Sequence, residues 1–242
     1  MKRRDLIKGT LAAGAALALP GRTAAQNPGP VPAMPIALTL RDRRLFQVAH
    51  EQLQKHGAGL WQRDIVGVAD FGLRSSEPRF HFVNFETGVV DSYLVAHGSG
   101  SDPEHDGWLN WFSNVPESQC TSEGAYMTFG WYTGRFGTSI RLEGLDPTCS
   151  NALDRAIVMH RATYAEPDHV ARWGKLGRSN GCFAMGEADF KLALLRLAGG
   201  RLLYADKLGI GPDGQTLAQP PRDLKLLVPE GAPQPPLLPG AF

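Results

Sequence analysis

The sequence has few cysteines, almost no net charge and no apolar run long enough to cross a membrane. Its 242 residues carry a formal net charge of +1, and no cluster of lysine and arginine lies in the body of the chain, which argues against nucleic-acid binding. The three cysteines cannot all pair with one another. Neither the C-x2-C nor the H-E-x-x-H spacing of common zinc sites occurs, so we expect no metal and no cofactor.

The N-terminus has the features of an export signal, which we expect over residues 1–25. Arg3 and Arg4 lie in a basic start, an apolar run of 11 residues covers 9–19, and small residues at 23–25 offer a cleavage site. At about 1.5 Å per residue the run is too short to span a bilayer of about 30 Å. The paired arginines followed by Leu-Ile-Lys resemble a twin-arginine signal more than a general secretory one. We therefore expect export by the twin-arginine machinery, to the periplasm or cell wall.

One domain holds nearly all of the periodic sequence. Hydrophobic residues make up 43% of the chain and charged residues 20%, a balance that allows a sizeable core. Proline-rich stretches lie on both sides of this domain. We predict a linker over residues 26–36, the domain over 37–208 and an extended, proline-rich tail over 209–242.

The predicted domain is mainly β with peripheral helices, an α+β fold. A first helix begins after Thr39, whose side chain is placed to cap it, and ends at Gly57. Runs rich in Val, Phe and Tyr follow, and turn residues between them indicate hairpins, one of them at 133–136. A second helix covers 187–198, before a Gly-Gly pair. The predicted strands cover 64–73, 79–85, 88–98, 125–132, 138–145, 155–160 and 201–206.

Cys120 and Cys149 flank the hairpin turn at 133–136 symmetrically in sequence. Residues at such positions lie opposite each other in an antiparallel ladder, about 4.5–5.5 Å apart at Cα, which is a separation that a disulfide accepts. An exported protein can keep such a bridge. We therefore predict a Cys120–Cys149 disulfide. The alternative is that Gly144 and Pro147 end the ladder first.

Cys182 is then the free thiol, in the segment "GRSNGCFA" at 177–184. We expect Arg178 to favour the thiolate and Gly181 to give the loop its conformation and a substrate its room. Consecutive N–H groups from Ser179 through Asn180 to Cys182 are expected to converge on an oxyanion. The residue types and their order favour a nucleophile over an inert thiol, and both over a metal ligand.

A nucleophilic cysteine also needs a base, and two histidines end predicted strands. His160 is the best candidate, and His97 is expected to line the same cleft. A histidine at a strand end is more often structural than catalytic, so each assignment competes with a packing role.

The segments "VMHRATY" and "GRSNGCFA", in this order, resemble the L,D-transpeptidase catalytic domain family of bacterial cell-wall enzymes, in particular the subgroup whose loop reads Arg-Ser-x-Gly-Cys-x-Ala. The resemblance covers about 66–206. It implies a largely β sandwich or barrel domain that acts on the peptide stems of peptidoglycan and cleaves the bond between a diamino acid and D-alanine through a thioester.

The resemblance also implies roles for single residues. Cys182 is the nucleophile, His160 is its base, and Ser179 and Gly181 shape the loop. The amides of Gly181 and Cys182 are the implied oxyanion donors. Further candidates for binding the substrate are Arg178, for a stem carboxylate, and, more weakly, Tyr164, His97, Ser113 and Asn114.

Two positions depart from the family pattern, and two other functions compete. Arg161 replaces a glycine that commonly follows the histidine, and Asn180 replaces a histidine in the loop. The chain could instead be a non-catalytic peptidoglycan-binding paralogue. A sortase-like cysteine transpeptidase shares the order of His and Cys, but its Thr-x-Thr-Cys strand is absent. Nothing in the sequence chooses between an amine and water as acceptor.

Overall fold

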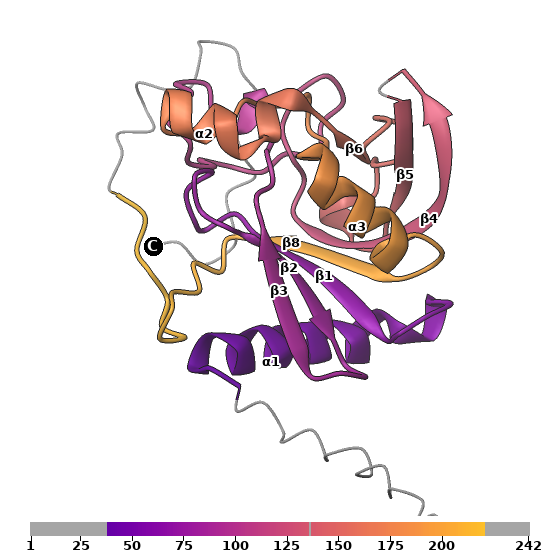
Figure 1. Ribbon diagram of the computed structural model, residues 1–242. Helices are drawn as coiled ribbons and strands as arrows, with labels where there is room; N and C mark the ends of the chain where they lie inside the picture. The colour runs from indigo at the N-terminus through magenta and orange to yellow at the C-terminus, as the bar shows by residue number, and fades with distance from the viewer. Residues whose placement is uncertain (1–37, 136, 221–242) are drawn as a thin grey trace, which may run out of the picture. The chain divides into compact units, whose positions relative to one another are not determined.

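A single mixed sheet of eight strands organises the domain, in the order β3-β2-β1-β8-β4-β5-β6-β7 (Figure 1). The computed structural model describes residues 38–135 and 137–220. The predicted export signal, the linker and the last part of the tail, 221–242, lie outside the described residues. The strands are β1 Ile65–Asp70, β2 Phe80–Asn84, β3 Val89–Tyr93, β4 Gly124–Gly134, β5 Gly137–Gly144, β6 Val158–Arg161, β7 Phe183–Met185 and β8 Leu202–Asp206.

The predicted mainly β fold with peripheral helices is confirmed. Strand β8 joins the two halves of the sheet, because it pairs in parallel with β1 and antiparallel with β4. The ladder between β4 and β5 shifts its register between Thr128 and Trp131. Such a bulge bends the strand and increases its twist. The helices are α1 Leu40–His56, α2 Pro167–Trp173 and α3 Glu187–Leu197.

Helices α1 and α3 cover opposite faces of the sheet (Figure 1). Thr39 caps α1 as predicted, since its Oγ1 accepts a hydrogen bond from the Asp42 N–H at 3.0 Å, and Gly57 ends the helix. The buried residues of α1 pack on the β1 side chains of one face, and those of α3 pack on the other face. Because both faces of β1 are covered, its burial is continuous rather than alternating.

Gly67 in the middle of β1 allows α3 to approach the sheet closely. A Cβ at this position would lie 2.9 Å from Leu197 Cδ1 and 3.0 Å from Phe80 Cζ. The chain leaves α3 through Gly199 and Gly200, with φ values of 95° and 90°, and enters β8. Beyond the predicted domain boundary at 208, Ile210 packs in the core beneath α1.

The predicted disulfide is wrong, because Cys120, Cys149 and Cys182 are all free. The ladder between β4 and β5 ends at the pair Tyr126 and Gly144, and Pro147 opens a 3-10 turn that carries Cys149 out of it. The Cys149 thiol donates instead to the Ala125 carbonyl at 3.1 Å, and the Cys120 thiol to the Ser118 carbonyl at 3.4 Å. The pairing of β4 with β5 therefore ends before it includes either Cys120 or Cys149.

Candidate active site

Strands β6 and β7 bring Cys182 and His160 to one face of the sheet. They pair in parallel, with Met159 beside Phe183 and His160 beside Ala184. Cys182 immediately precedes Phe183 and is thus level with Val158. Because Met159 and Phe183 point into the core, the alternation of side chains directs Cys182, Val158 and His160 to the opposite face. Cys182 and His160 are therefore diagonal neighbours on adjacent chain segments.

His160 is held as the tautomer that a base requires. Its Nδ1 lies 2.9 Å from the Arg161 carbonyl oxygen, and since a carbonyl only accepts, Nδ1 carries the proton. The nitrogen that can take up a proton is then Nε2. Burial lowers the pKa of His160, and the bond to the Arg161 carbonyl offsets part of that effect. The neutral imidazole is consequently the resting form at neutral pH.

Cys182 rests as a thiol, and the expectation that its surroundings favour the thiolate is wrong. The side chain is only 6% exposed, and its Sγ lies 3.8 Å from the Ala156 carbonyl oxygen. Burial raises the pKa of Cys182, while the Val158 N–H and the positive charge of Arg155 act in the opposite direction and are weaker. The cation that acts on this thiol is thus Arg155, and not the Arg178 that is near it in sequence.

Gly181 adopts a conformation that other residues avoid. Its φ is +106°, and a Cβ there would lie 2.6 Å from the Cys120 carbonyl oxygen and 2.9 Å from Ile157 Cδ1. Both the backbone angle and the close approach therefore require glycine. The sequence-based expectation of an unusual backbone before Cys182 is confirmed.

Ser179 closes the loop around Cys182 through its side chain. Its Oγ donates to the Cys182 carbonyl at 2.6 Å and accepts the Gly181 N–H at 3.2 Å. The Ser179 N–H donates to the His97 carbonyl at 2.9 Å. Two of the amides that were expected to converge on an oxyanion are thus engaged inside the protein, which corrects the predicted role of the Gly181 amide.

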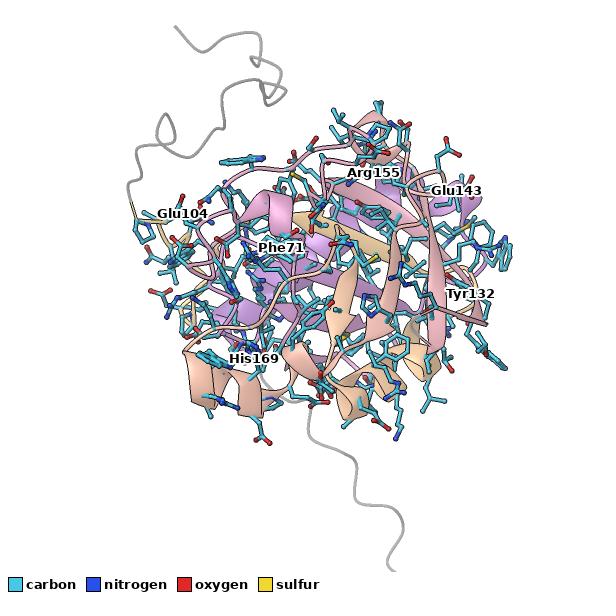
Figure 2. The ribbon with its side chains drawn as sticks, turned by 90° about the horizontal axis from the view of Figure 1, so that it is seen from above. Phe71, Glu104, Tyr132, Glu143, Arg155 and His169 are labelled. Carbon is cyan, nitrogen blue, oxygen red and sulfur yellow. The ribbon has the colours of Figure 1, made fainter. Side chains whose placement is uncertain are left out.

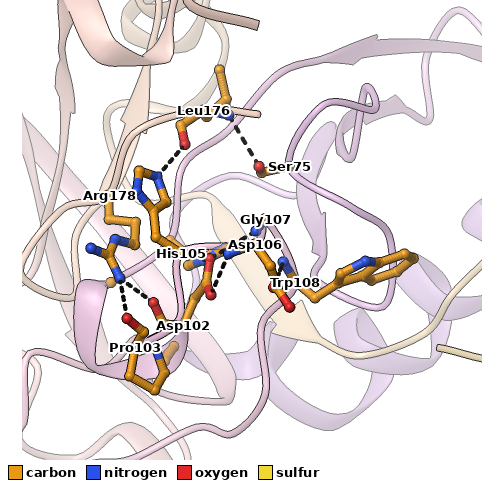
Figure 3. Close-up of polar contacts among 12 residues, drawn as sticks. Ser75, Asp102, Pro103, His105, Asp106, Gly107, Trp108, Leu176 and Arg178 are labelled. Carbon is orange, nitrogen blue, oxygen red and sulfur yellow. Dashed lines mark hydrogen bonds and ion pairs between the residues drawn. The ribbon is translucent and has the colours of Figure 1, made fainter. Parts of the chain in front are cut away.

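Arg178 connects the loop at 177–182, which we call the cysteine loop, to the segment at 102–103 by hydrogen bonds (Figure 3). Its Nη1 donates to the Asp102 carbonyl and, at 3.2 Å, to the Pro103 carbonyl. The Asp102 side chain in turn accepts the N–H groups of Asp106 and Gly107, both at 3.0 Å. This end of the guanidinium is therefore occupied by backbone, and a stem carboxylate would have to compete for it.

Tyr164 lies close enough to Cys182 to respond to its charge. It belongs to a 3-10 turn, η4 Thr163–Ala165. Tyr164 packs over Gly177 at the start of the cysteine loop, and a Cβ added to Gly177 would lie 2.5 Å from the Tyr164 Cβ. Burial, and secondarily a negative charge on Cys182, raise the pKa of Tyr164 to about 12. The phenol therefore stays protonated and can donate a hydrogen bond beside the nucleophile.

His97 does not line a cleft. It is 1% exposed, and its ring lies between the Arg79 guanidinium, 2.7 Å from Nδ1, and Asp102 Oδ2, 3.3 Å from Nε2. Burial lowers its pKa to about 4. Arg79 is itself fully buried, 4.9 Å from the ring centroid of Phe71. His97 therefore supports the cysteine loop from behind, through its carbonyl bond to Ser179.

Ser113 and Asn114 hold a neighbouring loop in place. The Asn114 side chain donates to the Pro147 carbonyl and to Ser150 Oγ, each at 3.1 Å, and accepts the Asn151 N–H at 3.2 Å. The Ser113 carbonyl accepts the Arg155 guanidinium at 2.9 Å. Both residues lie near the site, but their contacts are structural.

Arg155 is the residue of the site that the sequence did not reveal. Its half-buried guanidinium reaches two carbonyls and two hydroxyls of the segment 113–122, and a Cβ on Gly181 would lie 3.2 Å from its Nη2. Figure 2 shows it on the side of the molecule that also carries Glu143 of β5, away from His169 of α2. No motif marks an arginine whose partners are all distant in sequence.

Two hollows adjoin these residues. One, of about 330 Å³, lies beside Ala156 and Val158 and is also lined by Tyr132, Arg141, Leu153 and Ile157. The Arg141 guanidinium stacks on the Tyr132 ring, 5.0 Å from its centroid. The other, of about 350 Å³, is lined by Arg135, Gly137, Arg161, Ala162, Thr163, Glu166 and Glu187.

Two searches of the described residues are negative. No group of three or more His, Cys, Asp or Glu side chains is arranged to hold a metal ion in residues 38–135 and 137–220. Within the same ranges, no helix is both long and apolar enough to cross a membrane.

Comparison with known proteins gives the site its context. The family model of the L,D-transpeptidase catalytic domain matches residues 39–205, which is more than half of the chain. This chain belongs to the L,D-transpeptidase catalytic domain family. The model of the twin-arginine translocation pathway signal sequence matches residues 1–20. The predicted twin-arginine signal is thus confirmed, and with it export across the cytoplasmic membrane.

The chain also matches solved structures of L,D-transpeptidases, at low identity and low TM-score. An L,D-transpeptidase from Mycobacterium smegmatis is 13% identical, with a TM-score of 0.37 over 59% of this chain and 58% of its own. One from Mycobacterium tuberculosis H37Rv is 15% identical, with a TM-score of 0.37 over 59% and 57%. The match therefore spans less than two thirds of those chains. No curated protein matches the sequence.

The two departures from the L,D-transpeptidase pattern, Arg161 and Asn180, are exposed. The Arg161 side chain alternates with that of His160 and pairs with Glu187 Oε2 at 3.2 Å, at the start of α3. Only its carbonyl serves His160. Asn180 is exposed at the tip of the loop.

Proposed function

We propose that this chain is a cysteine-dependent L,D-transpeptidase that acts on peptidoglycan stem peptides outside the cytoplasmic membrane. The observation that supports it best is the register of β6 and β7, which sets His160 diagonally across from Cys182 with its Nδ1 proton bound to a carbonyl. A buried thiol next to a neutral imidazole is a nucleophile with a general base.

The proposed reaction begins with proton transfer from Cys182 Sγ to His160 Nε2. The thiolate attacks the carbonyl of the diamino acid that precedes D-alanine, and the new C–S bond leaves negative charge on the carbonyl oxygen. The Cys182 amide is the donor that we assign to this oxygen, because the Gly181 amide already binds Ser179 Oγ. His160 then protonates the leaving amine, and D-alanine departs from a thioester.

A second stem resolves the thioester. Its amine attacks the thioester carbonyl, gives one proton to His160 and forms the cross-link, while the sulfur leaves as a thiolate and regains a proton. Water in the same position would release a tripeptide, as a carboxypeptidase does. The acceptor is not assigned by any residue of the site.

The hollow beside Val158 suits the donor stem. It lies on the same face of the sheet as Cys182. Arg141 of β5, which lines it, pairs with Val158 of β6. The Arg141 guanidinium contacts the Tyr132 ring. It forms no ion pair with a carboxylate of the described residues. Its charge is therefore available to a carboxylate of the stem, and we assign it this role in place of Arg178.

Purified tetrapeptide muropeptides test the proposal. The mature protein should release D-alanine or form dimers by mass spectrometry, and should carry an acyl group on the Cys182 peptide after rapid quenching. Cys182→Ala and His160→Gln should lose activity by about 10³-fold or more. Arg141→Gln should raise KM with a smaller change in kcat.

Two outcomes would decide against the proposal. Equal turnover in the wild type and Cys182→Ala would exclude the thioester. A folded wild type that binds the muropeptides without releasing D-alanine would indicate a non-catalytic paralogue instead. Retention of near-UV circular dichroism in each variant serves as the folding control.

A further inference from the structure

Arg155 lies behind the cysteine loop and connects the turn before β6 to the segment 113–122. From the turn before β6, its Nη1 donates to the Ser113 carbonyl at 2.9 Å and to Ser122 Oγ at 2.6 Å. Its Nη2 donates to the Cys120 carbonyl at 2.5 Å and to Ser118 Oγ at 3.3 Å. A planar guanidinium is suited to such a set, because its donors have fixed directions.

The same group lies against Gly181. A Cβ at Gly181 would be 2.6 Å from the Cys120 carbonyl oxygen and 3.2 Å from Arg155 Nη2. Arg155 therefore holds the carbonyl that supports the residue immediately before the nucleophile. Any change in its position alters the surface on which Gly181 and Cys182 rest.

We propose that Arg155 is a positioning residue for Cys182, which holds the segment 113–122 against the cysteine loop and stabilises the thiolate that forms when His160 takes the proton. Its catalytic consequence rests on the proposed function, but its effect on the thiol does not. The positive charge stays in place through the cycle, while the charge of Cys182 changes from zero to minus one and back.

The other groups that face Cys182 do not supply a fixed positive charge. His160, from β6, is neutral at rest and becomes cationic only as the thiolate forms. Tyr164, from η4, is a neutral phenol whose pKa is raised to about 12. Arg178 points to the carbonyls of Asp102 and Pro103 (Figure 3). Arg155 is the cation whose field lowers the pKa of the Cys182 thiol against the effect of burial.

The test is the pH dependence of alkylation at Cys182. Iodoacetamide is added to the folded, mature protein over a range of pH, and modification is followed on the Cys182 peptide by mass spectrometry, apart from Cys120 and Cys149. Arg155→Gln should raise the apparent pKa of Cys182 by about one unit and slow alkylation about tenfold near pH 8. Arg155→Lys keeps the charge and should retain most of the wild-type profile.

Arg155→Lys separates positioning from charge. An ammonium group cannot hold the Ser113 and Cys120 carbonyls in a fixed fork, so the rate of acyl-enzyme formation should fall about tenfold while KM changes less. Arg178→Gln is the matched control for charge, because it removes an arginine that is nearer in sequence but points elsewhere. It should leave the alkylation profile unchanged.

Several results would overturn the proposal. One is an Arg155→Gln variant that melts as the wild type does and has the same alkylation profile. If that variant does not fold, an Arg155→Lys variant with the wild-type rate of acylation contradicts the positioning role. An upward shift in Arg178→Gln equal to that in Arg155→Gln would show a nonspecific effect of charge. If the wild type forms no acyl-enzyme, the proposed function fails, but the alkylation profiles still test Arg155.

Discussion

At the scale of single residues, the site depends on groups whose states are set by burial. His160 is kept neutral and Cys182 is kept as a thiol, so the pair does not exist as a preformed ion pair. In the proposed reaction the charge separation occurs only when a substrate is in place, and the fixed charge of Arg155 and the Cys182 amide offset its cost. A resting thiol is also protected from oxidation, because the thiolate is the reactive form.

Gly181 gives a residue-scale prediction. A side chain at φ +106° is strained by about 1–2 kcal/mol, and its Cβ would approach the Cys120 carbonyl oxygen to 2.6 Å. We therefore expect Gly181→Ala to displace Cys182, to lower kcat by about 10²-fold or more and to reduce the free energy of unfolding by about 2 kcal/mol or more. Chemical denaturation and muropeptide turnover measure the two effects.

Gly130→Ala is the matched control for Gly181→Ala. Gly130 lies in β4 without a positive φ, and a Cβ there would meet nothing within 4 Å. Alanine at this position should leave turnover unchanged and leave the stability equal or slightly higher. A Gly181→Ala variant that behaves like Gly130→Ala would contradict the account of the loop.

At the scale of elements, local sequence patterns predicted most of the fold. The cap at Thr39, the Gly-Gly pair after α3 and the turn between β4 and β5 are signals carried by a few adjacent residues. The first two are found where expected, and the turn is centred one residue later than predicted, because Gly134 pairs with Gly137. The end of a ladder is not such a signal. Whether β4 and β5 pair as far as the cysteines depends on the bulge at Thr128 and on packing of the turn at Pro147, which no local pattern encodes.

The site follows the same division. His160 and Cys182 could be predicted because each lies in a recognisable segment, and the parallel pairing of β6 and β7 then explains why the segments meet. Arg155 and the true partners of Arg178 could not, since their contacts join residues that are far apart in sequence. Proximity in sequence favoured Arg178, whose guanidinium donates to the carbonyls of Asp102 and Pro103.

The cap of α1 gives an element-scale prediction. Thr39 Oγ1 satisfies the Asp42 N–H, which otherwise has no partner within the helix. Thr39→Ala should lower the free energy of unfolding by about 1 kcal/mol, and Thr39→Ser should restore most of it. Muropeptide turnover should not change, because α1 packs on β1, β2 and β8, away from β6 and β7 at the end of the sheet. Equal stability of the alanine and serine variants would show that the cap contributes nothing.

At the scale of the whole molecule, His81 and His97, two of the three buried histidines, make the fold sensitive to acid. His81, in β2, donates or accepts at Nδ1 with Ser92 Oγ at 2.8 Å, and burial lowers its pKa to about 3. His97 is held between Arg79 and Asp102, and burial lowers its pKa to about 4. In the unfolded chain both take up a proton below about pH 6.5. The unfolded state therefore binds more protons than the folded state between about pH 6.5 and these lower values.

The sign of the effect follows from that difference. Stability contributed by the neutral histidines is fully present above about pH 6.5 and is lost as the pH falls toward 4 and then 3, with a slope of up to about 1.4 kcal/mol per pH unit for each group. Urea unfolding at a series of pH values should show this slope in the wild type. His81→Gln should be less stable near pH 7 but should show a slope smaller by about one proton. An unchanged slope in His81→Gln would mean that His81 is protonated in the folded protein. Its burial argues against this, because a charged imidazole at this position would have no counter-ion in contact.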